Sequence, residues 1–173
     1  MALVLVVIVG SVAAVVISNR RASERTISRL EAGACQFDRE SDDDAGQGRN
    51  HVSGSVRYAT DPPAGGNHSV PVAEPLVYSG QVPPDVQLVH ALEHGDIVLW
   101  YRPDAAPALI DELSGLADRY EGDVLVVPRP SISTPVAATA WHRRLLCPEF
   151  ERAALDLFVR SFRDKGPEKP PGG

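Results

Sequence analysis

Four of the five histidines fall within a short stretch of the chain and form a candidate metal site. His90 and His94 are four residues apart, and positions i and i+4 of a helix share one face, so both imidazoles can bind one ion. His68 and His51 lie close enough in sequence to complete the ligand set, and Glu93 supports these histidines or acts as a base. We therefore predict a metal site at His51, His68, His90 and His94.

The residue types also limit the ion that this site would hold. Met1 is the only methionine, which excludes a thioether copper(I) site, whereas imidazole ligands suit zinc or copper(II). Convergence of ring nitrogens from at least two of His68, His90 and His94 to about 3 to 3.5 Å would favour a metal, since ligand bonds are ~2.1 Å. Divergent side chains would argue against it.

Three alternatives to a metal site stay open at this point. The pocket could bind a small polar ligand instead of an ion. The histidines could simply order a loop in a structural or interaction domain of the cell envelope. The pattern from His90 to His94 also fits the inverted zinc-protease signature His-x-x-Glu-His, which would make the protein a metal-dependent hydrolase. The sequence leaves open whether the protein is an enzyme.

The elements around these residues can be read from proline, glycine and apolar spacing. Nine prolines and glycines between Asp61 and Pro84 predict a long ordered loop. Pro84 and Gly95 bound a short helix that carries His90 and His94. Further along the chain we expect strands at 97–101, 124–127 and 136–141, and helices over 109–120 and 150–162.

This order of elements predicts an α+β domain of two layers with a small mixed sheet and a βαββα-like core. The first two strands are joined through a helix, which requires a parallel crossover, and the short link to the third favours an adjacent strand. A thioredoxin-like redox activity is unsupported because there is no Cys-x-x-Cys pair.

Charged residues are distributed unevenly along the chain. The net charge is −6, which argues against a nucleic-acid partner, and residues 1–18 hold no charged side chain. We predict a single transmembrane anchor at 1–18, a juxtamembrane linker at 19–46, the α+β domain at 47–165 and a disordered tail at 166–173. The membrane is then the expected partner, and no protein partner is indicated.

The two cysteines help to predict on which side of the membrane the domain lies. If Cys35 and Cys147 are bonded, they close a loop of about 112 residues and stabilise the fold by roughly 4 to 5 kcal/mol. Two free thiols are the alternative. Arg20 and Arg21 after the anchor favour a cytoplasmic domain by the positive-inside rule, but the cysteine pair leads us to predict an extracytoplasmic one.

Several short motifs resemble a bacterial family known only as domain of unknown function 3105. They lie between about residues 47 and 168: Gly48-Arg-Asn-His51, Tyr58-x-x-Asp-Pro-Pro63, Gly66-x-His68, Val89-His90-Ala-Leu-Glu93-His94-Gly95, Val127-Pro-Arg-Pro130, Thr139-Ala-Trp141 and Gly166-Pro-Glu168. The resemblance implies a domain behind one amino-terminal membrane span, with no established activity. The four candidate histidines fall at the family's histidine positions.

Two departures from the family pattern matter. The usual Pro-Pro-Thr-Ser-Gly is Pro62-Pro63-Ala64-Gly65-Gly66 here, which weakens any role for a loop hydroxyl. His142 stands where a glycine is usual, which argues against His142 as a site residue.

Overall fold

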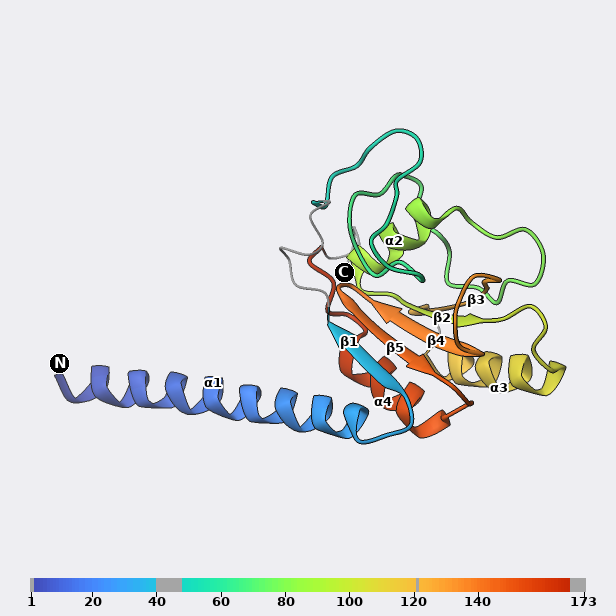
Figure 1. The fold of residues 1–173 in the computed structure, drawn as a ribbon. Coiled ribbons are helices and arrows are strands. Elements are labelled where there is room, and N and C mark those ends of the chain that lie inside the picture. The colour runs from blue at the N-terminus through green and yellow to red at the C-terminus, as the bar shows by residue number, and fades with distance from the viewer. Residues whose placement is uncertain (1, 40–47, 121, 169–173) are drawn as a thin grey trace.

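The computed structural model describes residues 2–39, 48–120 and 122–168 (Figure 1). Residues 40–47 and the last five residues, 169–173, lie outside the described residues. The helices are α1 (Ala2–Glu31), α2 (Asp85–His94), α3 (Pro107–Ala117) and α4 (Arg152–Phe162), with a short 3-10 turn at Asp118–Tyr120. The strands are β1 (Gln36–Arg39), β2 (Ile97–Tyr101), β3 (Val124–Pro128), β4 (Val136–Ala140) and β5 (Arg143–Cys147).

The five strands form one mixed sheet in the order β1-β5-β4-β2-β3. β2 and β3 are parallel, with α3 in the connection between them, and the other neighbouring pairs are antiparallel. The α+β class and the mixed sheet are therefore confirmed. The predicted core was too small, however, because β1 and β5 were not expected and add two strands on the β4 side.

The strand predicted at 136–141, which is β4 in the structure, does not lie where the short link before it suggests. β4 follows β3 in the chain but pairs with β2, on the side away from β3. Segment 76–78 occupies the outer edge of β3 instead, since Tyr78 donates to the Val126 carbonyl and Val126 donates to the Leu76 carbonyl. The edge that β4 would have covered is thus partly covered by the Pro/Gly loop.

Both faces of the sheet are covered, so the prediction of two layers was wrong. Side chains alternate along β2: Ile97, Leu99 and Tyr101 face a core shared with α3, α4 and the end of α1, while Val98 and Trp100 face a second core. That second core contains Leu88 and other residues of α2 and residues of the Pro/Gly loop. Figure 1 shows α2 and this loop on the opposite side of the sheet from α3 and α4.

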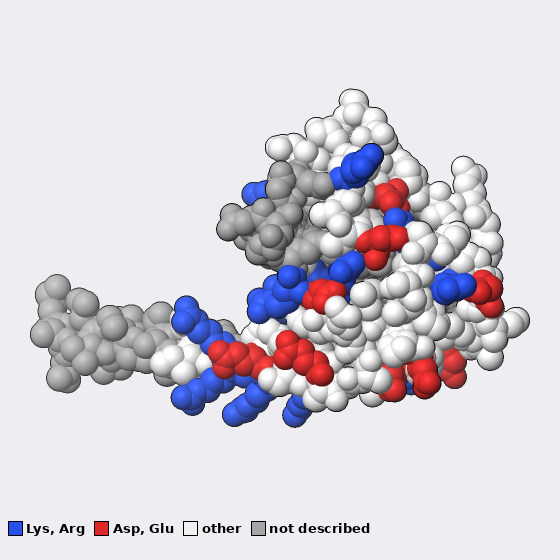
Figure 2. Space-filling view, viewed as in Figure 1, with Lys and Arg blue, Asp and Glu red and all other residues white. Residues whose placement is uncertain are grey.

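The first helix runs without a break from Ala2 to Glu31, so the predicted linker at 19–46 begins as helix. Exposed charged side chains follow residue 19 on this helix (Figure 2). Its end belongs to the folded domain, because Leu30 is fully buried against the main core. Within the described residues, no helix has the length and apolarity needed to cross a membrane. The predicted spanning helix at 1–18 is therefore not confirmed.

A disulfide joins Cys35 to Cys147, as predicted. Both residues are buried in the main core. The bond links the segment between α1 and β1 to the end of β5, across 112 residues of sequence. It therefore attaches α1 and β1 covalently to the carboxyl-terminal half of the sheet.

The start of the predicted disordered tail is packed onto the domain. The Glu168 amide donates to the Glu93 carbonyl, and the Asp164 amide donates to the Gly95 carbonyl. We refer to residues 164–168 as the carboxyl-terminal strap. The strap supplies donors to carbonyl groups at the end of α2 that the helix itself leaves without partners.

Candidate metal centre

The second helix positions three of the candidate residues. α2 starts after Pro84, has Asp85 in its first turn and ends at Gly95, whose φ of 102° is the left-handed conformation that glycine adopts most readily. His90 and Glu93 lie on its buried side, with only 3% and 2% of their surfaces exposed. Polar side chains at such depth require partners or an ion.

The Pro/Gly loop and the segment before it bring His51 and His68 to this helix. Val52 donates to the His68 carbonyl at 2.8 Å and His68 donates to the Asn50 carbonyl at 3.1 Å, so the two histidines form an isolated parallel bridge. The loop is attached in turn to α2, because the Ser69 amide donates to the Val86 carbonyl. Two histidines from a segment without regular structure are thus held at fixed positions.

An arginine fixes the start of this loop relative to α2. The Arg129 guanidinium, at the end of β3, donates to both Asp85 carboxylate oxygens, at 2.6 and 3.1 Å, and also to Asp61. It lies over the Trp100 ring, 5.1 Å from the ring centre. Because one cation holds both the first residue of α2 and the first residue of the loop, the two elements cannot shift independently.

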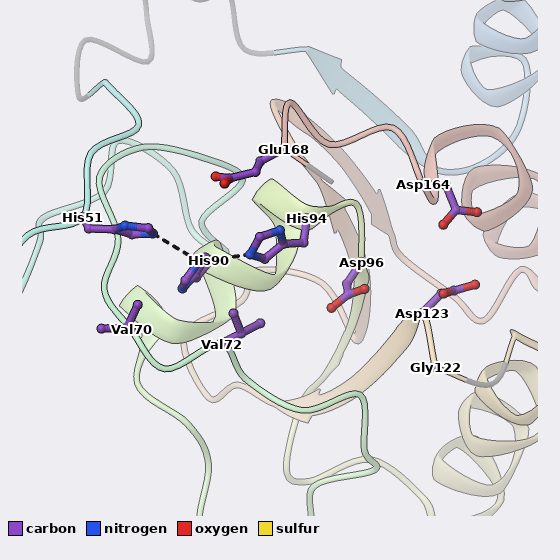
Figure 3. A pocket seen from close by; sticks show the side chains of 10 residues that line it. All are labelled: His51, Val70, Val72, His90, His94, Asp96, Gly122, Asp123, Asp164 and Glu168. Carbon is purple, nitrogen blue, oxygen red and sulfur yellow. Dashed lines mark hydrogen bonds between the residues drawn. The ribbon is translucent and has the colours of Figure 1, made fainter. Parts of the chain in front are cut away.

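The side chains of all five predicted site residues meet. His51 Nε2 and His94 Nε2 each lie 3.1 Å from His90 Nε2 (Figure 3), and His68 Nε2 lies 2.8 Å from Glu93 Oε2. Ligand atoms of His51, His68, His90 and Glu93 all lie within 4.8 Å of one another. The separation between His90 and His94 falls within the range expected for metal ligands. Glu93, expected as a supporting residue, lies among the potential ligands, and His94 contacts this group through His90.

Backbone carbonyls determine which ring nitrogens carry protons. His68 Nδ1 lies 2.9 Å from the Gly66 carbonyl and His90 Nδ1 lies 3.2 Å from the Ser69 carbonyl. A carbonyl only accepts, so both Nδ1 atoms donate, and in a neutral ring of this tautomer Nε2 carries a free lone pair. Burial and, to a smaller extent, the neighbouring histidines lower the pKa of His90 to about 4, so this ring is neutral at pH 7.

Several buried polar atoms in the cluster lack hydrogen-bond partners. Within the described part of the chain these include His68 Nε2, Glu93 Oε2 and His94 Nδ1. His68 Nε2 and Glu93 Oε2 are close enough for an ion pair, but their orientation does not give a hydrogen bond. Unsatisfied buried polar atoms are costly, and this pair lacks the hydrogen bonds that such burial usually requires.

A cleft of about 560 Å³ opens beside the cluster (Figure 3). His51, His90 and His94 form one part of its wall, and Val70 and Val72 form an apolar part. Its other polar lining residues are acidic: Asp96, Asp123, Asp164 and Glu168. Burial, with further contributions from Asp123 and Asp164, raises the pKa of Asp96 to about 7.

Sequence reasoning did not identify this acidic part of the cleft. Asp164 and Glu168 belong to the strap, and Asp123 precedes β3, so these residues come from distant parts of the chain. Asp96 directly follows the glycine that ends α2, which was the one local signal. Glu168 belongs to the motif Gly166-Pro-Glu168, but nothing in that motif indicates a contact with α2.

His142 lies outside the histidine cluster, as its departure from the family pattern suggested. It occupies the turn between β4 and β5 with a φ of 58°, a left-handed conformation that glycine adopts more readily than histidine. A β-carbon added at Gly65 would lie 2.9 Å from Cδ2 of the His142 ring. The two departures from the family pattern therefore meet in space, and the small residue at 65 leaves room for the large one at 142.

This contact predicts a coupled effect on stability. Gly65→Ser should lower the free energy of unfolding by about 1 to 3 kcal/mol because the new side chain overlaps His142. In a His142→Gly background the same change should cost roughly 1 kcal/mol less, since the ring is gone. Urea unfolding of all four proteins measures this coupling. Equal costs in the two backgrounds would show that the residues do not compete for space.

Comparison with known proteins gives one match. A family model described as a protein of unknown function (DUF3105) covers residues 51–172, which includes all four clustered histidines. Comparison with curated proteins gave no significant match, and neither did comparison with solved structures. Because the family model covers more than half of the chain, this protein belongs to the DUF3105 family.

Proposed function

We propose that this domain binds a divalent transition metal ion, zinc or copper(II), at the histidine cluster. The observation that carries the proposal is the approach of two imidazole Nε2 atoms to the Nε2 of His90, at 3.1 Å each. Ligands held about 2.0 to 2.1 Å from a tetrahedral zinc ion lie about 3.3 Å apart. The separations of 3.1 Å are close to that value.

Hydrogen bonding alone accounts poorly for this arrangement. Because His90 Nδ1 donates to Ser69, His90 Nε2 offers one lone pair to two neighbouring rings. One lone pair in the plane of the ring cannot accept two well-aligned hydrogen bonds. An ion that accepts a lone pair from each ring resolves this conflict.

The surroundings of the cluster resemble the support that metal-binding histidines usually have. The carbonyls of Gly66 and Ser69 fix the tautomers of His68 and His90 so that Nε2 is free to bind. Glu93 adds one negative charge, which offsets part of the charge of a divalent ion in a buried site. A set of imidazoles with one carboxylate and no thiolate suits zinc or copper(II).

The disulfide supports an extracytoplasmic location for this site. Structural disulfides form and persist in oxidising compartments and are rare in the cytosol. The bond between Cys35 and Cys147 joins two buried positions of the core, as expected of a structural bond. We therefore infer that the domain folds and binds its ion outside the cytoplasm.

Metal analysis of the purified full chain tests the proposal. After loading with zinc and dialysis, the wild type should retain about one ion per chain, and His90→Ala should retain much less because it loses the shared ligand. His94→Ala should also bind more weakly. His142→Gly is the matched control, since it removes a histidine outside the cluster and should keep full occupancy. Affinity should fall as the pH is lowered because protons compete for the imidazole nitrogens.

Two results would contradict the proposal. One is a wild type that holds no zinc or copper after loading, and the other is equal metal retention by His90→Ala. The histidines would then act only in ordering the Pro/Gly loop on α2, which is the competing interpretation. Circular dichroism of each variant separates loss of the ion from loss of the fold.

A further inference from the structure

The position of the cluster relative to the cleft indicates what else binds there. His68 and Glu93 are buried and do not line the cleft, whereas His51, His90 and His94 do. An ion at the cluster, as proposed above, would therefore have protein ligands on its buried side and the cleft on its other side. Sites that act on or bind external molecules keep such an open position.

The far side of the cleft carries negative charge that the protein only partly neutralises. In Figure 3, Asp96, Asp123 and Asp164 lie together beyond His94, while Glu168 lies between His51 and His94. Arg163 pairs with Asp123 and lies 3.6 Å from Asp164. The Asp96 carboxylate lines the cleft and makes no hydrogen bond or ion pair among the described residues.

A second observation independent of the acidic residues points to a ligand. The side chains of His68 and Glu93 are more than nine-tenths buried, and His68 Nε2 and Glu93 Oε2, which lie 2.8 Å apart, make no hydrogen bond within the cluster that borders the cleft. Val70 and Val72 form an apolar part of the cleft wall, and 66% and 36% of their surfaces are exposed. The cleft thus combines the proposed metal site, an apolar wall and a group of carboxylates in one space.

We propose that this cleft binds a small organic ligand with a protonated amine at one end and a metal-coordinating donor at the other. The donor occupies the open position of the ion, the hydrocarbon part contacts Val70 and Val72, and the amine is held by Asp96, Asp164 and Glu168. This inference rests on the proposed metal site. It adds the chemical class of the ligand, which the metal alone does not define.

Three imidazoles with different tails test the inference on the zinc-loaded full chain. In 1-(3-aminopropyl)imidazole the tail is a cation, in 1-butylimidazole it is neutral and of the same size, and in 3-(imidazol-1-yl)propanoate it is an anion. Each offers the same ring nitrogen to the ion. By isothermal titration calorimetry, we expect the cationic compound to bind about tenfold more tightly than the neutral one, and the anionic compound to bind most weakly.

Substitution of the acidic residues shows whether they cause this order. Asp164→Asn removes one charge and keeps a residue type that tolerates the φ of 58° at this position. It should reduce the preference for the cationic compound roughly threefold and leave binding of 1-butylimidazole unchanged. Glu168→Gln should act in the same direction. Glu149→Gln is the control, since Glu149 is exposed and does not line the cleft.

The outcomes separate this inference from the proposed function. If the chain binds zinc but binds all three imidazole compounds with equal affinity, the proposed amine ligand is overturned and the proposed metal site is not. An unchanged preference in both acidic variants would do the same. A chain that binds no zinc would overturn both proposals.

Discussion

Removal of the disulfide should lower the free energy of unfolding by about 4 to 5 kcal/mol. The bond between Cys35 and Cys147 closes a loop across 112 residues, and in the chain-entropy model a cross-link of that span restricts the unfolded chain strongly. Small domains are stable by only about 5 to 15 kcal/mol, so the Cys35→Ala, Cys147→Ala protein should be close to its limit at 37 °C. Urea unfolding at 25 °C measures the loss.

The wild type under reducing conditions is the control for this experiment. It keeps both sulfur atoms in the core, so the difference between it and the double variant gives the packing contribution alone. A loss below about 1 kcal/mol in both proteins would show that the cross-link does not stabilise the fold as the chain-entropy model requires. Thiol labelling of denatured, unreduced protein from its native compartment should find neither cysteine free.

Gly166→Ala should damage both the fold and the metal site. A β-carbon at this position would lie 2.0 Å from the Glu93 carbonyl oxygen and 2.5 Å from the Gly95 nitrogen. Both are backbone atoms at the end of α2, so the strap must move away and lose its hydrogen bonds from Asp164 and Glu168. We expect a loss of about 2 to 3 kcal/mol in the free energy of unfolding.

Metal affinity should fall together with stability in this variant. The strap fixes the carbonyl of Glu93, whose side chain lies among the potential ligands, and loss of such support commonly costs roughly 10- to 100-fold in affinity. Urea unfolding and zinc titration measure the two effects separately. Wild-type affinity and stability would mean that the strap does not pack on α2.

Gly115→Ala provides a matched control for Gly166→Ala. Gly115 is exposed within α3, and a β-carbon there would meet no atom within 4 Å. Alanine favours the helical conformation, so this variant should be more stable than the wild type by about 0.5 to 1 kcal/mol. The two identical substitutions should therefore change stability in opposite directions.

The helices and central strands could be predicted because their signals are local. α2 is bounded by Pro84 and Gly95, and both residues act through their own backbone conformations. β2 is a continuous apolar run because both faces of this central strand are buried. That same burial shows that helices or loops must cover both faces, a consequence that the two-layer prediction missed.

The strands β1 and β5 could not be predicted in the same way. The four residues of β1 include Gln36, Asp38 and Arg39, and β5 begins with Arg143 and Arg144, so neither has an apolar strand pattern. Their conformation depends on pairing with neighbours in the sheet and on ion pairs such as Arg144 with Asp38. The β1 pairing joins residues over a hundred positions apart, and β5 pairs with the adjacent β4 without an apolar alternation of its own, so neither segment shows a periodic signal.

The candidate site likewise contains some residues that local spacing brings together and others that only the tertiary structure brings together. The sequence alone placed His90, Glu93 and His94 together, because a helical repeat of 3.6 residues brings positions i, i+3 and i+4 onto one side. Only the tertiary structure brought His51 within 3.1 Å of His90, across 39 residues, and assembled the acidic side of the cleft from Asp96, Asp123 and the strap. Those contacts depend on the path of a loop that is held by individual hydrogen bonds, and such bonds follow no spacing rule that a sequence displays.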